Sequence, residues 1–278
     1  MSSISNNMKN DFGPWALIAG ASEGLGAAFA REIASKGINV ALIARQKDLL
    51  DELSKEFKTK YQVETKILQM DLASPDILEK VKSATKDLEI GLLVYNAAVS
   101  LIGAFHNFEI EQHLKTIEVN CKAPILLTYY FGKKMKERGS GGIILMSSLA
   151  GLQGNPLHAH YSATKGYNMN LAEALWYEMK NHGVKVMACV AGATRTPNYV
   201  NSKPKRAGLI DPKPMEPSKV AKGALKSLWK NKPYHIPGAQ NRFYAFIMRR
   251  LQSRKSTIKM MGNIAMKMYG DEKNHSSK

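Results

Sequence analysis

Apolar segments of strand length alternate along the chain with longer segments in which apolar residues recur every three or four positions. The strand-length segments lie at 15–21, 38–44, 65–71, 90–98, 141–148 and 184–192. The segments with helical spacing lie at 23–37, 46–60, 75–86, 109–138 and 160–182. Strands that are apolar on both faces are typical of a parallel sheet covered by helices on each side. The pattern therefore predicts an α/β fold with a doubly wound parallel sheet.

The two ends of the chain and one internal segment depart from this pattern. Residues 1–12 are short and polar, which predicts a flexible N-terminal tail before a single domain over 13–240. Residues 195–217 contain five prolines and follow the last predicted strand, so we expect a substrate loop or lid there. Residues 241–278 are expected to form a basic helical extension. The N-terminus lacks the basic start and apolar run of a secretory signal.

The positive charge of the chain is concentrated near its C-terminus. Residues 1–200 hold 22 Lys/Arg and 19 Asp/Glu, whereas residues 201–278 hold 18 and 4, and the chain as a whole carries +17. Such an asymmetry indicates an anionic partner, or serves solubility. From 241 onward, aromatic and Met residues alternate with Arg and Lys. A basic amphipathic helix on an anionic membrane or over a hydrophobic pocket fits this pattern. Packing against the domain or a dimer partner is the alternative.

Cysteine usage bears on the compartment. The chain has two cysteines, Cys121 and Cys189, and both lie in apolar-flanked segments. Their spacing suggests neither a disulfide framework nor a metal site. A reducing compartment fits this usage, so we expect a cytoplasmic protein, with peripheral membrane contact as one interpretation of the basic extension.

Three glycines follow the first predicted strand, in the pattern G-x-x-x-G-x-G. They are Gly20, Gly24 and Gly26, and an amphipathic helix comes directly after them. Glycine permits a tight turn there and lets the backbone approach a pyrophosphate, which the free N–H groups of the following helix attract. The placement of the loop predicts a dinucleotide-binding site.

The residue after the second predicted strand distinguishes between two dinucleotides. An acidic side chain at this strand end would accept hydrogen bonds from the adenosine ribose of NAD(H). The sequence instead has Ala44 followed by Arg45, and a guanidinium matches a phosphate in shape and charge. We therefore expect a preference for NADP(H) over NAD(H).

A phenol and an ammonium stand four residues apart in "YSATK", at Tyr161 and Lys165. On a helix over 160–182 the two side chains share one face. A nearby ammonium favours the phenolate, so we expect a lowered pKa at Tyr161, suited to proton transfer. Ser148 ends a predicted strand, where its hydroxyl can stabilise charge on a substrate oxygen.

These motifs occur in one order with two others. They are the glycine loop, "NAA" at 96–98, Asn120 in "EVNC", "SS" at 147–148 and "YSATK" at 161–165. Together they resemble the short-chain dehydrogenase/reductase family, in its NADP(H)-preferring type with an Asn-Ser-Tyr-Lys tetrad. The resemblance covers about residues 13–200 and implies a Rossmann-like fold.

The resemblance also implies roles for individual residues. The catalytic residues would be Asn120, Ser148, Tyr161 and Lys165, with Asn120 holding a water that links Lys165 to solvent. Lys165 would also bind the nicotinamide ribose, and Asp71 would contact the adenine. The implied cofactor-binding residues are Gly20, Ser22, Gly24, Leu25, Gly26, Arg45, Asp71, Leu72, Asn96, Ala97, Ala98, Tyr161, Lys165, Gly192, Thr194 and Thr196.

The expected activity is hydride transfer between NADP(H) and a carbonyl or secondary alcohol, as in reduction of a ketone or 3-oxoacyl compound. The family also suggests a homodimer or higher homo-oligomer. A cofactor-binding sensor or scaffold without turnover is the alternative. We find no nucleic-acid-binding motif. His158 and His160 flank Tyr161, and the sequence leaves open whether either touches substrate.

Overall fold

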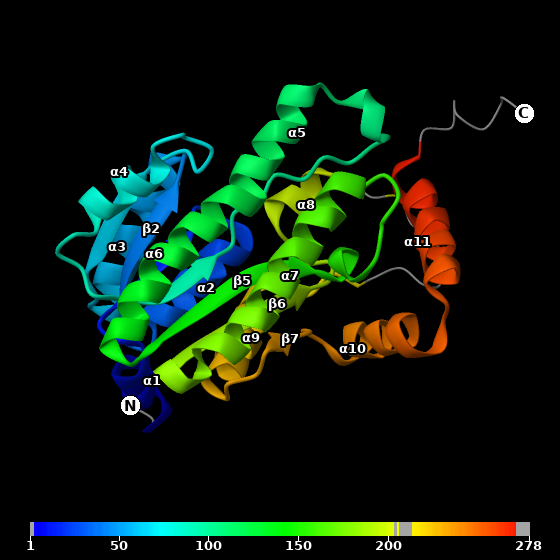
Figure 1. Ribbon diagram of the computed structural model, residues 1–278. Helices are drawn as coiled ribbons and strands as arrows, with labels where there is room; N and C mark the ends of the chain where they lie inside the picture. Colours follow the sequence, from blue (N-terminus) through cyan, green and yellow to red (C-terminus); the bar gives the residue numbers. More distant parts are fainter. Residues whose placement is uncertain (1–2, 203–204, 206–212, 271–278) are drawn as a thin grey trace, which may run out of the picture.

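The computed structural model of the protein describes residues 3–202, 205 and 213–270, in which helices flank one sheet (Figure 1). Seven parallel strands form the sheet, in the order β3-β2-β1-β4-β5-β6-β7. Their bounds are β1 Trp15–Ala19, β2 Asn39–Ala44, β3 Thr65–Gln69, β4 Ile90–Tyr95, β5 Gly141–Ser148, β6 Val184–Ala191 and β7 Tyr234–His235. The predicted Rossmann-like sheet is confirmed. Its strand order reverses between β1 and β4, and ligands bind such sheets at the carboxyl ends beside the reversal.

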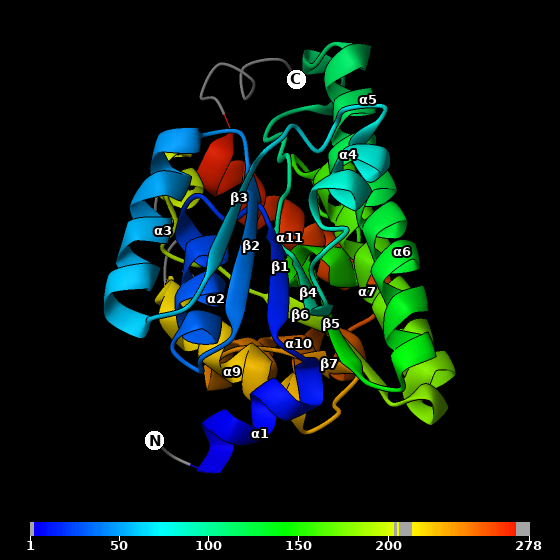
Figure 2. The same cartoon turned by 90° about the vertical axis from the view of Figure 1, so that its left-hand side faces the viewer.

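Helices cover both faces of the sheet (Figure 2). On one face lie α2 Gly24–Ala34, α3 Lys47–Tyr61 and α9 Pro217–Trp229. On the other lie α4 Ile77–Ala84, α6 Ala123–Arg138 and α7 Ala159–Met179. Successive strand residues pack alternately into two hydrophobic cores, one on each face of the sheet. Ile18 and Leu42 pack on the α2 side, whereas their neighbours Leu17 and Ile43 pack on the opposite side. This double burial explains why the strands are continuously apolar.

The long helix expected over 109–138 is interrupted. It consists of α5 Ile110–Ile117, a π turn over Glu118–Lys122 and then α6. A π turn places an extra residue in the helix and is frequent at functional sites. The turn contains Asn120, which is completely buried.

The expected flexible tail at 1–12 is wrong for its described part. Residues Ser3–Phe12 form helix α1, and the side chains of Met8 and Phe12 are buried in the core on the α2 side. Phe12 lies against Gly142 at the start of β5, where a Cβ would crowd its ring. A short polar sequence concealed this anchor because, among residues 8–12, the large buried side chains are Met8 and Phe12 alone.

The basic C-terminal segment is helical in its described part. Helix α10 Ala239–Phe246 continues into a π turn over Ile247–Leu251, and α11 Arg254–Tyr269 follows. The hydroxyl of Ser253 accepts a hydrogen bond from the Ser256 N–H at 3.2 Å and so caps α11. We call residues 239–269 the C-terminal cover, since they cross the carboxyl-end side of the sheet (Figure 1). Within the described residues, no helix has the length and apolar content needed to span a bilayer.

Candidate active site

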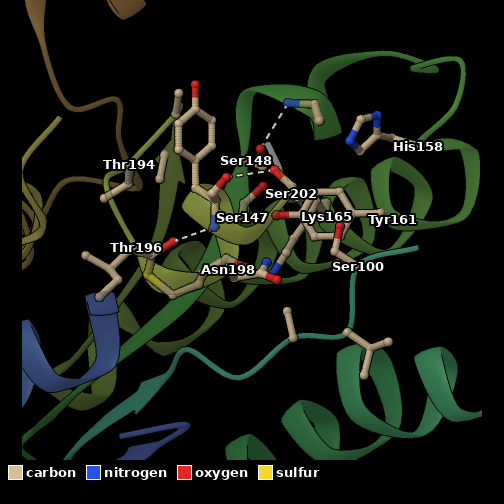
Figure 3. A pocket seen from close by; sticks show the side chains of 18 of the residues that line it. Ser100, Ser147, Ser148, His158, Tyr161, Lys165, Thr194, Thr196, Asn198 and Ser202 are labelled. Carbon is tan, nitrogen blue, oxygen red and sulfur yellow. Dashed lines mark hydrogen bonds between the residues drawn. The ribbon is translucent and has the colours of Figure 1, made fainter. Parts of the chain in front are cut away.

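One large cavity, of about 760 Å³, lies at the carboxyl ends of the strands (Figure 3). Residues that follow β1 through β6 line its floor, and residues of the C-terminal cover line the opposite wall. All four predicted catalytic positions lie at or directly behind this floor. Ser148, Tyr161 and Lys165 line the cavity, whereas Asn120 does not.

The glycine loop after β1 requires glycine at two positions for packing alone. Gly20 has φ +81°, and a Cβ on it would stand 2.7 Å from the backbone of Ala97. A Cβ on Gly26 would overlap the Gly20 carbonyl. The Asn96 side-chain amide donates to that same carbonyl at 2.9 Å. Asn96 and Ala97 therefore hold the turn that begins α2. Because the glycines carry no side chains, a ligand can come close to the backbone of this turn.

The N-terminus of α2 fits an anion. Its N-cap residue, Glu23, makes no side-chain capping bond, and the first turn holds no acidic residue. Ser22, Glu23, Gly24 and Leu25 line the cavity at this point, so the Glu23 carboxylate is the one acidic group in this run. Uncapped N–H groups and the positive end of the helix dipole together favour a phosphate. The residues here are thus suited to the pyrophosphate of a dinucleotide.

Three polar residues lie around the end of β2: Ser22, Arg45 and Gln46. The Ser22 hydroxyl donates to Gln46 Oε1 at 3.0 Å, and Arg45 stands between Ala44 and Gln46. All three line the cavity, and Arg45 is exposed. Among the described residues, no carboxylate forms an ion pair with Arg45. A guanidinium without a carboxylate partner, in a cavity that a hydroxyl and an amide also line, could hold a second phosphate group.

The ends of β3 and β4 complete this side of the cavity. Asp71 and Leu72 follow β3, and both line the cavity. Asp71 Oδ1 accepts from the Ala73 N–H at 2.9 Å, and its other oxygen lies 3.9 Å from Lys115 Nζ. Beyond β4, Ala98 also lines the cavity. These predicted cofactor-binding residues are brought together in space, and their contacts with the cofactor stay predictions.

Ser147 and Lys165 lock α7 to β5. Ser147 donates its hydroxyl hydrogen to the Lys165 carbonyl at 2.8 Å, and Lys165 Nζ donates to the Met146 carbonyl at 2.9 Å. Both residues are almost completely buried. Burial lowers the pKa of Lys165 to about 8, because an ammonium loses hydration there. The Ser147 hydroxyl is therefore used in packing α7 on β5, which leaves the Ser148 hydroxyl to meet a ligand in the cavity.

The predicted lowering of the Tyr161 pKa is wrong for this structure. Burial raises the pKa of Tyr161, and the hydrogen bond from Ser148 offsets this only in part. Lys165 Nζ lies 5.5 Å from the centre of the Tyr161 ring, but it is bonded to Met146. The loss of hydration at the phenol exceeds any stabilisation of the phenolate by the lysine. Tyr161 therefore keeps its proton at neutral pH.

Ser148 and Tyr161 form the polar centre of the floor, and Figure 3 shows them beside Lys165. Ser148 ends β5 in extended conformation, and its hydroxyl accepts from the Ala150 N–H at 3.2 Å. Its hydrogen bond with Tyr161 joins two hydroxyls at one spot. Two adjacent hydroxyl groups in a cavity can both donate to one substrate oxygen.

Asn120 acts behind the floor. Its side-chain oxygen accepts from the Val99 N–H at 2.8 Å, and its amide donates to the Val99 carbonyl at 2.8 Å and to Thr164 at 3.1 Å. The Asn168 amide donates to the Asn120 carbonyl at 3.0 Å. Asn120 thus joins the segment after β4 to helix α7. Its role in holding a water stays a prediction.

The segment after β6 forms the remaining part of the floor. Gly192, Thr194 and Thr196 all line the cavity. A Cβ on Gly192 would meet Asn241 of the C-terminal cover at 2.7 Å, so glycine is needed for the cover to approach. Thr196 caps helix α8 Pro197–Asn201, accepting from the Tyr199 N–H at 3.3 Å.

The predicted lid at 195–217 is anchored at its base. A parallel bridge pairs Thr194 with Met215, and Met215 exchanges backbone bonds with Ala193 and Arg195 at 2.9 Å each. Residues 203–204 and 206–212 of this segment lie outside the described residues. Its described polar residues Asn198 and Ser202 line the cavity.

The two histidines beside Tyr161 differ in position. His158 lines the cavity, 5.1 Å from the Tyr269 ring, and its Nδ1 is buried without a partner among the described residues. Burial lowers its pKa, so the ring is neutral near pH 7. His160 does not line the cavity, and its ring bonds to His113 at 2.8 Å.

The sequence offered a C-terminal helix over a hydrophobic pocket as one interpretation, but it did not identify the residues of the wall opposite the floor. The C-terminal cover presents mainly apolar side chains to the cavity, with methionine the commonest: Tyr244, Ile247, Met248, Gln252, Met260, Met261, Ile264, Ala265, Met268 and Tyr269. The run of methionines after residue 247 was the available signal, since Met is favoured where a surface must adapt to bulky apolar ligands.

Comparison with known proteins agrees with this arrangement. The profile of the family described as short chain dehydrogenase matches residues 14–207. A 7beta-hydroxysteroid dehydrogenase of Clostridium sardiniense is 34% identical over 240 residues, covering 85% of this chain and 90% of the relative. A human very-long-chain 3-oxoacyl-CoA reductase is 36% identical over 180 residues, 63% of this chain and 58% of the relative.

Two solved structures share the architecture. One, from a study of 7beta-hydroxysteroid dehydrogenase stereoselectivity, superposes with a TM-score of 0.85 at 27% identity, covering 91% of this chain and 98% of the other. The second is a short-chain dehydrogenase from Sphingobium yanoikuyae in complex with NADPH. Its TM-score is 0.76 at 29% identity, covering 86% and 93%.

Proposed function

The chain belongs to the short-chain dehydrogenase family, and we propose that it reduces a bulky, mainly apolar ketone with NADPH. The observation that carries this proposal is the meeting of Ser148, Tyr161 and Lys165 at the floor of a large cavity whose opposite wall is rich in methionine. Reduction and oxidation use the same residues, so the secondary alcohol is the substrate in reverse.

The cofactor assignment rests on two features of the floor and on one relative. The uncapped α2 N-terminus suits the pyrophosphate. Arg45 and Ser22 suit the extra phosphate of NADP(H). The NADPH complex of the Sphingobium yanoikuyae relative is consistent with this assignment. When bound, NADPH supplies the hydride.

The chain's own residues would handle the substrate oxygen. Ser148 and Tyr161 donate hydrogen bonds to it, which polarises the carbonyl. Tyr161 then gives up its Oη proton as negative charge develops on that oxygen. Lys165, charged below its pKa of about 8, stabilises the phenolate that remains. Asn120 keeps α7 and the segment after β4 in register.

The substrate class follows from the cover. Met261, Ile264 and Met268 face the cavity from α11, and Ile247 and Met248 face it from the π turn. A small polar ketone would leave these side chains without contacts, whereas a fused-ring or long-chain ketone would cover them. The two relatives named for a hydroxysteroid and a very-long-chain 3-oxoacyl-CoA agree with a large hydrocarbon substrate.

The test follows NADPH oxidation with steroid ketones, a long-chain 3-oxoacyl thioester and a small ketone as substrates. We expect turnover with at least one bulky ketone and little with the small one. NADPH binding, measured by fluorescence in the same samples, separates the two ways to fail. Tight binding without turnover on any ketone would favour the sensor alternative, and absence of binding would refute the cofactor assignment.

We also propose that the chain forms a homodimer. Apolar side chains at Ile110, Leu114, Ile117, Ile125 and Tyr129 form a stripe along α5 and α6, and each is between 42% and 71% exposed. A helix face this apolar is typical of an interface. Sedimentation of Leu114→Ser and Tyr129→Ser, each expected to shift the protein toward monomer, tests the assignment.

A further inference from the structure

The C-terminal cover has two faces, and the second does not serve the cavity. Tyr244, Ile247 and Met248 line the cavity. Phe243, Phe246 and Leu251, from the same stretch of chain, are exposed to solvent instead. These three outward side chains are 60%, 54% and 69% exposed, respectively. We call the surface they form, together with the exposed cations beside them, the outer face: Arg242, Phe243, Phe246, Arg249, Arg250, Leu251, Arg254 and Lys255.

The outer face lies in a segment that contains no acidic residue. Between residues 217 and 270 the sequence has 12 Lys/Arg and neither Asp nor Glu. In the described part of the chain, none of the five cations on the outer face pairs with a carboxylate. Along residues 242–255, cations without a carboxylate partner therefore stand close in sequence to exposed aromatic and aliphatic side chains.

We propose that the outer face docks the protein on the surface of an anionic lipid bilayer. Phe243, Phe246 and Leu251 enter the boundary between head groups and acyl chains, and the arginines contact anionic head groups. An interfacial helix combines just these two features, a small apolar face and flanking Lys/Arg. The positive charge of the outer face is complementary to such a membrane. The cover itself, residues 239–269, has no acidic residue with which these cations could pair.

A second copy of the chain fits this surface poorly. Two outer faces brought together would place ten unpaired cations in one interface, and like charges in an interface are strongly unfavourable. The apolar stripe on α5 and α6 offers self-association without that repulsion. Nucleic acid would attract the arginines but would gain nothing from Leu251, which is the most exposed apolar side chain of the cover.

Vesicle sedimentation with the full chain tests the proposal. Vesicles of phosphatidylcholine alone and of phosphatidylcholine with phosphatidylserine are compared at low and high salt. We expect binding only when phosphatidylserine is present, and weaker binding at high salt. No sedimentation with phosphatidylserine vesicles at low salt would overturn the proposal, whatever the protein's catalytic activity.

Two double variants locate the contact. Arg249→Gln with Arg250→Gln should weaken the partition coefficient about 25-fold, at about fivefold for each cation. Phe243→Ser with Phe246→Ser should weaken it about tenfold. Neither pair lines the cavity, and the thermal unfolding of each variant shows whether it is folded.

The matched controls remove equivalent groups elsewhere. Lys133→Gln with Lys136→Gln removes two exposed cations from α6, and Tyr177→Ser removes an aromatic side chain that is 63% exposed on α7. Both should retain wild-type binding. Equal losses in the controls and in the outer-face variants would refute the assigned surface. Self-association that disappears only in the Phe243/Phe246 variant, without vesicle binding, would make a second copy the occupant.

Discussion

The floor and the cover of the cavity hold their side chains in different ways. On the floor, polar groups are fixed by short hydrogen bonds to backbone atoms: Ser147 to the Lys165 carbonyl, Lys165 to the Met146 carbonyl and Asn120 to both backbone groups of Val99. Each of these residues is at most 3% exposed. A group held by several buried bonds has one position, which is what proton transfer needs.

The cover has few such bonds. Its cavity-facing residues are mostly Met, Ile and Tyr, and Asn241 packs closely against Gly192 of the floor. Methionine side chains change rotamer at little cost and so can fit more than one ligand shape. Under the proposed function, we expect the floor to fix the reaction and the cover to select the substrate.

The largest effect should follow from removing the hydroxyl group of Tyr161, which supplies the proton in the proposed reaction. Tyr161→Phe keeps the ring and its packing but takes away the hydroxyl. We expect kcat/KM for ketone reduction to fall about 10³-fold, because a positioned acid contributes on that scale. Steady-state kinetics with the best bulky ketone measures this loss. NADPH affinity, measured by fluorescence, should change little, and an unchanged kcat/KM would refute the role of Tyr161.

The next effect concerns the far end of the floor. Arg45→Asp replaces the guanidinium with a carboxylate, which repels a phosphate and accepts from ribose hydroxyls. We expect the ratio of kcat/KM for NADPH over NADH to fall about 100-fold. Lys47→Gln is the matched control, since Lys47 is an exposed cation two residues away that already pairs with Asp51. An equal fall of this ratio in both variants would show that the cofactor preference depends on the overall positive charge of this region and not on Arg45 itself.

The floor was predictable from sequence because its residues follow strands. Parallel strands bring their carboxyl ends to one edge, so Gly20, Arg45, Ser148 and Gly192 had to be neighbours once the sheet was inferred. Strand ends were predicted a residue or more too late where apolar residues continued into the loop, as at Ala97 and Ala98. Apolar character persists there because both residues lie against the cavity or the glycine loop.

The cover was only partly predictable. Its helical and basic character could be expected, but periodicity cannot show which core a helix meets. Strand β7, at Tyr234–His235, has only two residues and is too short to produce a recognisable hydrophobic pattern in the sequence. This strand leads the chain to α10. The pKa of Tyr161 was also beyond reach, since it depends on burial that only the folded cavity provides.

A smaller effect distinguishes the lysine's charge from its position. The pKa of Lys165 is lowered to about 8, so the side chain is charged below that value and neutral above it. If the charge stabilises the Tyr161 phenolate, kcat/KM for NADPH in the reduction should be level below about pH 8. Above that pH it should fall about tenfold per pH unit. A level profile well above that pH would mean that Lys165 acts only through its hydrogen bond to Met146.

The smallest effect tests the cover directly. Met261→Ser shortens an apolar side chain that faces the cavity, so kcat/KM for a bulky ketone should fall about five- to tenfold, as expected for roughly 1 kcal/mol of lost apolar contact. For a small ketone it should not change. Met266→Ser is the control, because Met266 lies on the same helix, is half-buried and does not line the cavity.

Comparing these two variants separates contact from stability. Both remove a methionine from α11, so any loss of helix stability should affect both, and thermal unfolding measures that shared loss. Only Met261→Ser should distinguish the bulky ketone from the small one. If instead both variants reduce both activities equally, the cover acts by closing the cavity as a whole, and the methionines do not select the substrate. That result would remove the distinction between a floor that fixes the reaction and a cover that chooses what reacts.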